Sequence, residues 1–72
     1  MRITTWNVNS IRARENRVLN WIDQHQPDVL CLQELKCEEE QFPFDGFDQL
    51  GYEVSLVGQK SYNGVAIASP TF

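Results

Sequence analysis

The chain has few cysteines and no long apolar run, and both absences limit what it can be. Its 72 residues contain only Cys31 and Cys37, which make neither a disulfide framework nor a Cys/His metal-binding spacing. We expect Cys31, inside an apolar segment, to be a small buried thiol. No apolar run approaches the ~20 residues that cross a membrane, and Met1-Arg2-Ile3 leads into strand-like sequence without a signal peptide. The sequence therefore predicts a cytoplasmic protein of a reducing compartment with no membrane partner.

Basic residues are scarce as well. Six Lys and Arg against ten Asp and Glu give a formal net charge of −4, which argues against a simple nucleic-acid-binding module. The charges are nevertheless segregated, because Arg12, Arg14 and Arg17 follow the first strand-like segment and acidic residues cluster at 38–48. The arginines could meet phosphate on one face. Solvated helix charges explain the arginines about as well and explain the acidic cluster better.

A strand and then a helix open the chain. Residues 2–8 are rich in β-branched and aromatic types, which predicts a strand. Residues 14–25 place Val18 and Ile22 on one face at helical spacing. Pro27 ends this helix, since the residue before a proline avoids the α region.

A second strand is predicted at residues 28–34. It is apolar on both faces through 29–32, as expected of a parallel strand covered on both sides. Strand, helix and strand make a βαβ unit, which is right-handed in about 98% of cases and leaves its strands parallel. Asn7 and Glu34 then emerge at the same edge of the sheet, where ligands of open α/β sheets bind.

The remaining residues predict two further strands with irregular connections. We expect helical turns near 38–41 and 47–50, a strand at 52–57, a polar loop at 58–64 and a strand at 65–68. Ser69-Pro70 is expected to end the last strand, which has no evident partner beyond the third. We expect Phe42, Phe44 and Phe47 to dock the acidic segment on the core. Such a sheet leaves an edge unpaired and one face thinly covered, so residues 1–72 are interpreted as a fragment of one larger domain.

Glu34 and Asn7 are the strongest candidates for chemistry. A carboxylate at the end of an apolar strand is costly unless something uses it. One Glu suffices as half of a Mg²⁺ site, because Mg²⁺ takes only one or two carboxylates besides waters and substrate phosphate. An ion pair of Glu34 with Lys36 or Arg12 fits its position equally well. Asn7 could donate to a phosphate oxygen or orient a catalytic carboxylate, or it could merely satisfy turn backbone.

Weaker candidates flank this pair. Asn9 and Ser10 are good helix caps, and Lys36 could neutralise phosphate charge although lone lysines are usually solvated. Tyr62-Asn63-Gly64 is a turn signal, whose functional interpretation is an aromatic ring and an amide facing a DNA backbone. We expect His25, late in the helix, to be a packed ring or a helix-terminal cation rather than a base.

Three stretches together resemble the exonuclease III family of Mg²⁺-dependent AP endonucleases. They are Ile3-Thr-Thr-Trp-Asn-Val-Asn-Ser-Ile-Arg-Ala13, Gln26-Pro-Asp-Val-Leu-Cys-Leu-Gln-Glu-Leu-Lys36 and Gly58-Gln-Lys-Ser-Tyr-Asn-Gly-Val-Ala-Ile67. They span essentially the whole chain, and the last one favours this branch over the inositol-phosphatase, sphingomyelinase and DNase I-like branches. The resemblance implies an α/β fold in which residues 1–72 are the N-terminal part of a four-layered, DNase I-like α/β sandwich.

The resemblance also implies a function. The parent enzyme would be a monomer that hydrolyses the phosphodiester 5′ to an abasic site in duplex DNA and acts on 3′ ends. The glutamate matching Glu34 holds Mg²⁺, with Mn²⁺ as an alternative, and the asparagine matching Asn7 binds phosphate and positions a catalytic aspartate. We therefore place Asn7 and Glu34 in the catalytic and metal-binding set. Substrate contacts are expected from Asn9, Arg12, Lys36, Tyr62 and Asn63.

The chain departs from the family in two ways. The catalytic tyrosine, the Asp-x-Asn motif and the C-terminal Ser-Asp-His are not among its 72 residues. Leu35 stands where the family commonly has Thr, which is tolerable if the side chain faces the core. We therefore expect the isolated chain to be inactive and poorly folded. The alternatives are another phosphoesterase of the same superfamily and a small non-catalytic α/β binding module.

Overall fold

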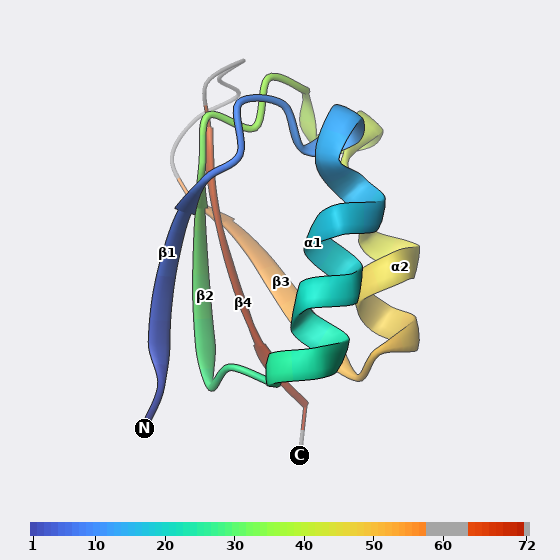
Figure 1. Ribbon diagram of the computed structural model, residues 1–72. Helices are drawn as coiled ribbons and strands as arrows, with labels where there is room; N and C mark the ends of the chain where they lie inside the picture. The colour runs from blue at the N-terminus through green and yellow to red at the C-terminus, as the bar shows by residue number, and fades with distance from the viewer. Residues whose placement is uncertain (58–63, 72) are drawn as a thin grey trace.

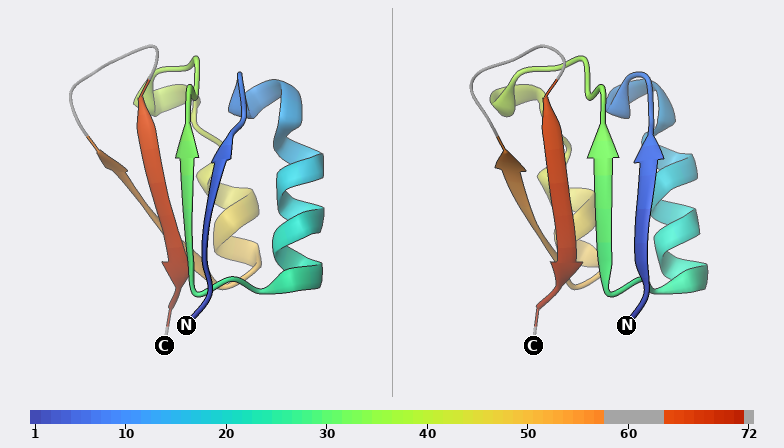
Figure 2. Two further views of the ribbon diagram at one scale, coloured as in Figure 1. Left: turned by 60° about the vertical axis from the view of Figure 1, so that its left-hand side comes forward. Right: turned by 90° about the vertical axis from the view of Figure 1, so that its left-hand side faces the viewer.

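The computed structural model describes residues 1–57 and 64–71 and shows a mixed α/β fold (Figure 1). Within these residues the elements are β1 (Ile3–Asn7), α1 (Ile11–His25), β2 (Val29–Gln33), η1 (Glu39–Gln41), α2 (Phe44–Gln49), β3 (Tyr52–Val57) and β4 (Val65–Pro70). The strands form one sheet in the order β1-β2-β4-β3. Both α-helices lie on the same face of this sheet (Figure 2). No helix in the described ranges combines the length and apolarity needed to cross a membrane.

The predicted βαβ unit is present. β1 pairs in parallel with β2 from Ile3↔Val29 to Asn7↔Gln33, so both strands end at one edge of the sheet, the upper edge in Figure 1. We call this the carboxyl edge. β4 is antiparallel to both β2 and β3. The carboxyl edge is therefore also where β3 ends and β4 begins.

Helix α1 begins at Ile11 rather than near Arg14. The Ser10 hydroxyl oxygen accepts a hydrogen bond of 3.3 Å from the Ala13 N–H and caps the first turn. Ile11 is fully buried beneath this cap, but the charged residues that follow it hide the contact in the sequence. The predicted end at His25 is confirmed, and Gln26 closes the helix in the left-handed region at φ 47°.

Two boundaries in the second half differ from the prediction. β4 runs to Pro70, so the expected stop at Ser69-Pro70 is wrong. β4 pairs with β2 only as far as Ala68, so the proline breaks no ladder on that side. The expectation that β4 has no partner beyond β3 is also wrong, since β4 lies between β2 and β3. α2 begins at Phe44 rather than near residue 47, whereas β3 spans the predicted residues.

The core lies between the helices and the sheet. Its fully buried side chains include Ile11, Val18, Ile22, Leu30, Leu32 and Phe47. The apolar face predicted for α1 is therefore confirmed. Of the three phenylalanines expected to dock the acidic segment, Phe42 and Phe47 are buried, but Phe44 is 37% exposed.

The opposite face of the sheet is bare. On it Ile3 is 64% exposed and Ile67 is 39% exposed, and Val29 and Cys31 are half-buried. No described residue lies over this face (Figure 2). The predictions of a strand covered on both sides and of a buried Cys31 are therefore wrong for the described part of the chain, whereas the thinly covered face is confirmed.

Raising the pH above about 8.5 is expected to destabilise this fold through Cys37. Burial raises the pKa of the Cys37 thiol, and the charge of Arg12 offsets part of that rise. An unfolded thiol ionises near pH ~8.5. Between that pH and the higher folded pKa the unfolded state loses its proton first, so the free energy of unfolding falls as the pH rises. The fall is at most about 1.4 kcal/mol per pH unit.

Urea denaturation between about pH 7.5 and 9.5 measures this slope. The matched control is Cys37→Ala, which has no thiol to titrate and should show a flatter dependence. The same slope in both proteins would contradict the assignment to Cys37.

Candidate functional site

The carboxyl edge brings together the two residues that the sequence singled out. Asn7 is the last residue of β1, and Glu34 follows the last residue of β2. The Asn7 side-chain nitrogen Nδ2 donates a hydrogen bond to Glu34 Oε2. This contact joins residues far apart in the sequence, because the parallel strands of a βαβ unit end side by side. Among the described contacts, the partner of the Glu34 carboxylate is thus Asn7.

The orientation of the Asn7 amide follows from its second partner. The Asn9 N–H donates to Asn7 Oδ1 at 3.2 Å, so the oxygen faces the Asn9 backbone and the nitrogen faces Glu34. Both contacts agree on the placement of nitrogen and oxygen, which for an amide must come from its hydrogen bonds. The carboxylate of Glu34 accepts this bond at Oε2.

The loops that follow β1 and β2 are tied together by their main chains. The N–H groups of Val8, Ser10 and Ile11 donate to the carbonyls of Gln33, Glu34 and Leu35 at 3.1, 2.9 and 3.0 Å. The parallel pairing thus continues past the ends of both strands. These bonds satisfy three N–H groups of the first loop and three carbonyl groups on the β2 side.

Two residues after β2 have left-handed backbone conformations, and buried and half-buried side chains alternate there. Glu34 has φ 55° and Lys36 has φ 54°, while Leu35 and Cys37 between and after them are buried. Glu34 and Lys36 are half-buried at the surface. Leu35 lies in the core, so its departure from the family's usual Thr is accommodated as expected.

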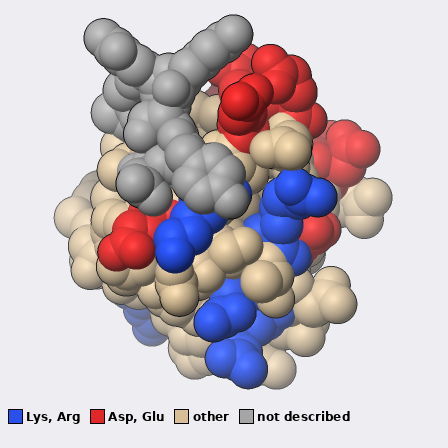
Figure 3. All heavy atoms as spheres, turned by 90° about the horizontal axis from the view of Figure 1, so that it is seen from above, with Lys and Arg blue, Asp and Glu red and all other residues tan. Residues whose placement is uncertain are grey.

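Basic and acidic side chains separate around this edge. Arg12 and Arg17 are exposed and Arg14 is half-buried, and all three line a shallow hollow on the first turns of α1. Figure 3 looks onto the carboxyl edge and shows a group of basic side chains with acidic ones gathered beside them. A cationic surface next to Glu34 and Asn7 suits an anionic substrate.

The remaining predicted site residues fall into two groups. Asn9 and Lys36 lie in the two loops described above, whereas Tyr62 and Asn63 lie outside the described residues. Gly64 accepts a bond of 3.3 Å from the Leu35 N–H, so β4 begins beside the loop that follows β2. His25 is exposed in the last turn of α1 and stacks on Trp21 with ring centroids 4.5 Å apart, which agrees with the packed-ring alternative.

Sequence reasoning missed the main-chain role of Asn9 and Ser10. Asn9 has φ 47° and Ser10 has φ 96°, and their N–H groups bond to Asn7 and Glu34 respectively. The weak signal available was an Asn-Ser pair between a strand and a helix, since Asn tolerates the left-handed region better than most residues.

The donor set at this edge fits a hard divalent cation with few protein ligands. The described residues contain no group of three or more His, Cys, Asp or Glu that could enclose a metal. Glu34 offers one carboxylate, and Mg²⁺ is usually held by one or two carboxylates while keeping several waters. A single carboxylate beside an amide therefore fits a hard cation of the Mg²⁺ or Mn²⁺ type.

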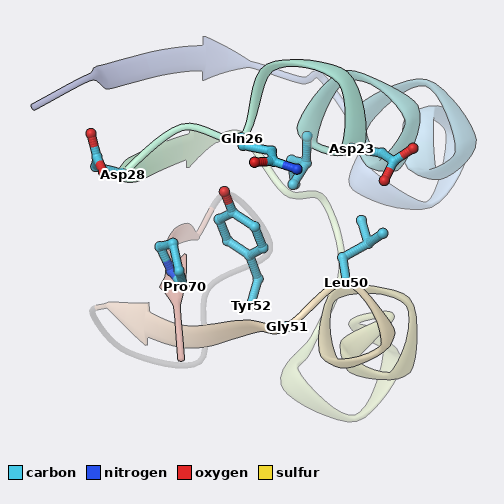
Figure 4. Close-up of a pocket in the computed structure, with 8 residues that line it drawn as sticks. Asp23, Gln26, Asp28, Leu50, Gly51, Tyr52 and Pro70 are labelled. Atoms are coloured by element: carbon cyan, nitrogen blue, oxygen red, sulfur yellow. The ribbon is translucent and has the colours of Figure 1, made fainter. Parts of the chain in front are cut away.

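A cavity of about 340 Å³ lies away from this site, at the opposite end of the sheet (Figure 4). Asp23, Asp28, Tyr52 and Pro70 are among its lining residues. The Tyr52 hydroxyl donates to the Pro27 carbonyl at 2.6 Å, which explains why this polar group tolerates burial. Burial and then the charge of Asp28 raise the pKa of Tyr52. This cavity holds none of the candidate site residues, and its tyrosine is used in packing.

Comparison with known proteins agrees with this geometry. Residues 4–71 match the sequence model of the Endonuclease/Exonuclease/phosphatase family. The exodeoxyribonuclease III of Haemophilus influenzae is 42% identical over 67 residues, which cover 93% of this chain and 25% of that protein. The family resemblance carried by the three motifs is thereby confirmed.

Solved structures show the same arrangement. An AP endonuclease from Archaeoglobus fulgidus superposes with a TM-score of 0.88 at 49% identity, covering 96% of this chain and 27% of that chain. The 3′ phosphatase NExo from Neisseria, solved with a product DNA hairpin, superposes with a TM-score of 0.89 at 46% identity, covering 100% and 28%. The chain thus spans about a quarter of the length of these relatives. It belongs to the Endonuclease/Exonuclease/phosphatase family.

Proposed function

We propose that this chain carries the metal-binding and phosphate-binding part of a Mg²⁺-dependent DNA-repair nuclease. The proposed reaction is hydrolysis of the phosphodiester 5′ to an abasic site in duplex DNA, with further action on 3′ ends. The observation that carries the proposal is the Asn7–Glu34 hydrogen bond at the carboxyl edge, in a chain similar to proteins named exodeoxyribonuclease III and AP endonuclease. Residues 1–72 would form the N-terminal part of one domain of a monomeric enzyme.

The proposed roles follow from the geometry. Glu34 would hold the cation through the carboxylate oxygen that Asn7 does not contact. When bound, the cation supplies positive charge to the scissile phosphate and the leaving oxygen. Asn7 keeps the carboxylate oriented through one N–H, and the other hydrogen of the same nitrogen can donate to a phosphate oxygen.

Further residues are proposed to contact the DNA. Arg12 and Lys36 place cationic charge beside Glu34, where it attracts backbone phosphates and weakens with added salt. Asn9 lies next to the Asn7 amide. Tyr62 and Asn63 are assigned to the DNA face from the family resemblance alone.

The described site residues do not include a group placed to deprotonate water. Arg12 and Lys36 are cations, and Glu34 is engaged by Asn7 and the proposed metal. General acid–base help is worth about 10²–10⁴-fold in rate. We therefore expect the isolated 72-residue chain to bind a divalent cation without cleaving DNA.

A chimera tests the proposed function. Residues 1–72 would replace the matching quarter of the H. influenzae exodeoxyribonuclease III. The chimera should nick abasic duplex DNA in Mg²⁺ and stop when the metal is chelated, while the isolated chain should be inert under the same conditions. A folded chimera that acts on neither abasic sites nor 3′ ends, or only on small phosphate esters, would contradict the proposal.

A further inference from the structure

Two adjacent main-chain N–H groups hold the two central residues of the site. The Asn9 N–H donates to the Asn7 side-chain oxygen at 3.2 Å, and the Ser10 N–H donates to the Glu34 carbonyl at 2.9 Å. We call this pair, Asn9 and Ser10, the N–H clamp. The Asn7 amide also bonds to the Glu34 carboxylate. One N–H of the clamp therefore holds the Asn7 side chain, and the other holds the main chain of Glu34.

The clamp requires an unusual backbone conformation. Asn9 has φ 47°, and Ser10 has φ 96° and ψ 102°. Asn visits the left-handed region fairly readily, but a serine at φ 96° clashes through its β-carbon and costs on the order of 1–3 kcal/mol. Such a conformation persists only where the surroundings over-determine it.

The surroundings of Ser10 do over-determine it. Val8 and Ile11 on either side are buried in the core, and their N–H groups are anchored to Gln33 and Leu35. The chain from residue 8 to residue 11 therefore has to pass from β1 into α1 within a fixed span. Ser10 takes the conformation that both turns the chain and directs its N–H at Glu34.

We infer that Ser10 is a positioning residue for Glu34. Its main-chain N–H fixes the Glu34 carbonyl and with it the left-handed turn, φ 55°, that brings the carboxylate to Asn7. One carboxylate oxygen is then committed to Asn7, and the other is the oxygen that we assign to the cation. The cation part of this inference rests on the proposed function, whereas the positioning of Glu34 against Asn7 does not.

The cap made by the Ser10 side chain must be separated from the clamp made by its main chain. The hydroxyl oxygen bonds to the Ala13 N–H at 3.3 Å, so any loss of serine also weakens the start of α1. Ser10→Ala removes the cap and keeps a β-carbon of the same kind. Ser10→Gly removes both the cap and the backbone clash. Ser10→Val adds β-branching, which a residue at φ 96° accommodates poorly.

The Asn7 side-chain amide reports the clamp in the metal-free chain. In a ¹H–¹⁵N spectrum, the signal of the hydrogen bonded to a carboxylate is shifted downfield, and it returns to the ordinary side-chain amide position when that bond is lost. Ser10→Ala and Ser10→Gly should keep the wild-type Asn7 signals, and Ser10→Val should lose them while the signals of the β3–β4 pair stay in place. Mn²⁺ broadening of signals near Glu34 should show an affinity about 10-fold lower in Ser10→Val, the size expected when a residue supporting a ligand is lost.

Each outcome decides the inference. Wild-type Asn7 signals in a folded Ser10→Val chain, or their loss in Ser10→Ala, would overturn it. If Ser10→Val does not fold, hydrogen exchange in the wild-type chain decides instead. The Ser10 N–H and the Asn7 side-chain hydrogen bond should then open in one event, and an Asn7 bond that opens while the Ser10 N–H stays protected would overturn the inference. Mn²⁺ binding absent from every variant, with Asn7 signals that follow the prediction, would contradict the proposed function alone.

Discussion

Phe47→Ala is expected to remove about 3–5 kcal/mol from the free energy of unfolding. Phe47 is the largest of the side chains that are fully buried, with 0% of its surface exposed. Its ring packs against Phe42 with centroids 5.4 Å apart. At about 0.05–0.15 kcal/mol per residue, a domain of this length has on the order of 4–11 kcal/mol of stability in all, and the bare face of the sheet places this chain toward the low end of that range. The substitution should therefore leave a substantial unfolded population at 25 °C.

Urea denaturation followed by the fluorescence of Trp6 and Trp21 measures this loss. Phe44→Ala is the matched control, because it removes the same side chain from the same helix, where Phe44 is 37% exposed and also contacts Phe42. Phe44→Ala should lower the free energy of unfolding by only about 1 kcal/mol, since a partly exposed ring buries less apolar area. Equal losses in the two variants would show that α2 does not pack as described.

The strands with a strong pattern could be predicted from the sequence. The alternation in residues 52–57 predicts β3 to the residue, because its two faces meet different environments. The βαβ handedness predicts that Asn7 and Glu34 meet, since parallel strands end at one edge. The mispredicted boundaries of helices and strands are those that tertiary contacts determine. Ile11 starts α1 because it is buried under the Ser10 cap, and β4 continues to Pro70 because β3 pairs with it there.

The burial of β2 on both faces was mispredicted for a different reason. Val29 and Cys31 were expected to be buried on the far side of β2, because a run of apolar residues is typical of a parallel strand that is covered on both faces. None of the described residues covers that face of the sheet, and Ile3 and Ile67 are exposed on it. The relatives are about four times as long as this chain. We propose that in such a longer protein a second sheet covers this face, as the sandwich implied by the resemblance requires.

The N–H clamp could not be predicted, because backbone torsions at Asn9 and Ser10 depend on groups far along the chain. Ser10 bonds to Glu34 and Ile11 to Leu35, and neither contact has a pattern of its own in the sequence. The residue types of the site were predictable, since carboxylate and amide groups at strand ends are conspicuous. Their orientation was not, since it is set by main-chain bonds between two loops.

Glu34→Gln is expected to lower the Mn²⁺ affinity of the chain by at least about 100-fold. The substitution keeps the size of the side chain and an oxygen that can accept from Asn7, so the loops after β1 and β2 should stay in place. It removes the negative charge of the carboxylate that is hydrogen-bonded to Asn7 at this edge. Loss of a residue that supports a metal ligand typically costs about 10–100-fold in affinity, and loss of the ligand itself should cost more. In the chimera the rate of abasic-site cleavage should fall by about 10²–10³-fold, the scale of lost charge stabilisation in a transition state.

Glu40→Gln makes the same change of charge in an exposed glutamate of η1 and should leave Mn²⁺ affinity and cleavage close to wild type. Comparing the two variants separates the loss of a metal ligand from a general effect of net charge, because the net charge becomes less negative by one unit in both. Metal-free binding to DNA sharpens the test: Glu34→Gln should bind duplex DNA slightly more tightly, as removal of a negative charge near phosphate reduces repulsion. Tighter DNA binding together with weaker metal binding is the combination expected of a ligand. Unchanged Mn²⁺ affinity in a folded Glu34→Gln chain would remove Glu34 from the metal site and leave the Asn7–Glu34 contact as a structural bond alone.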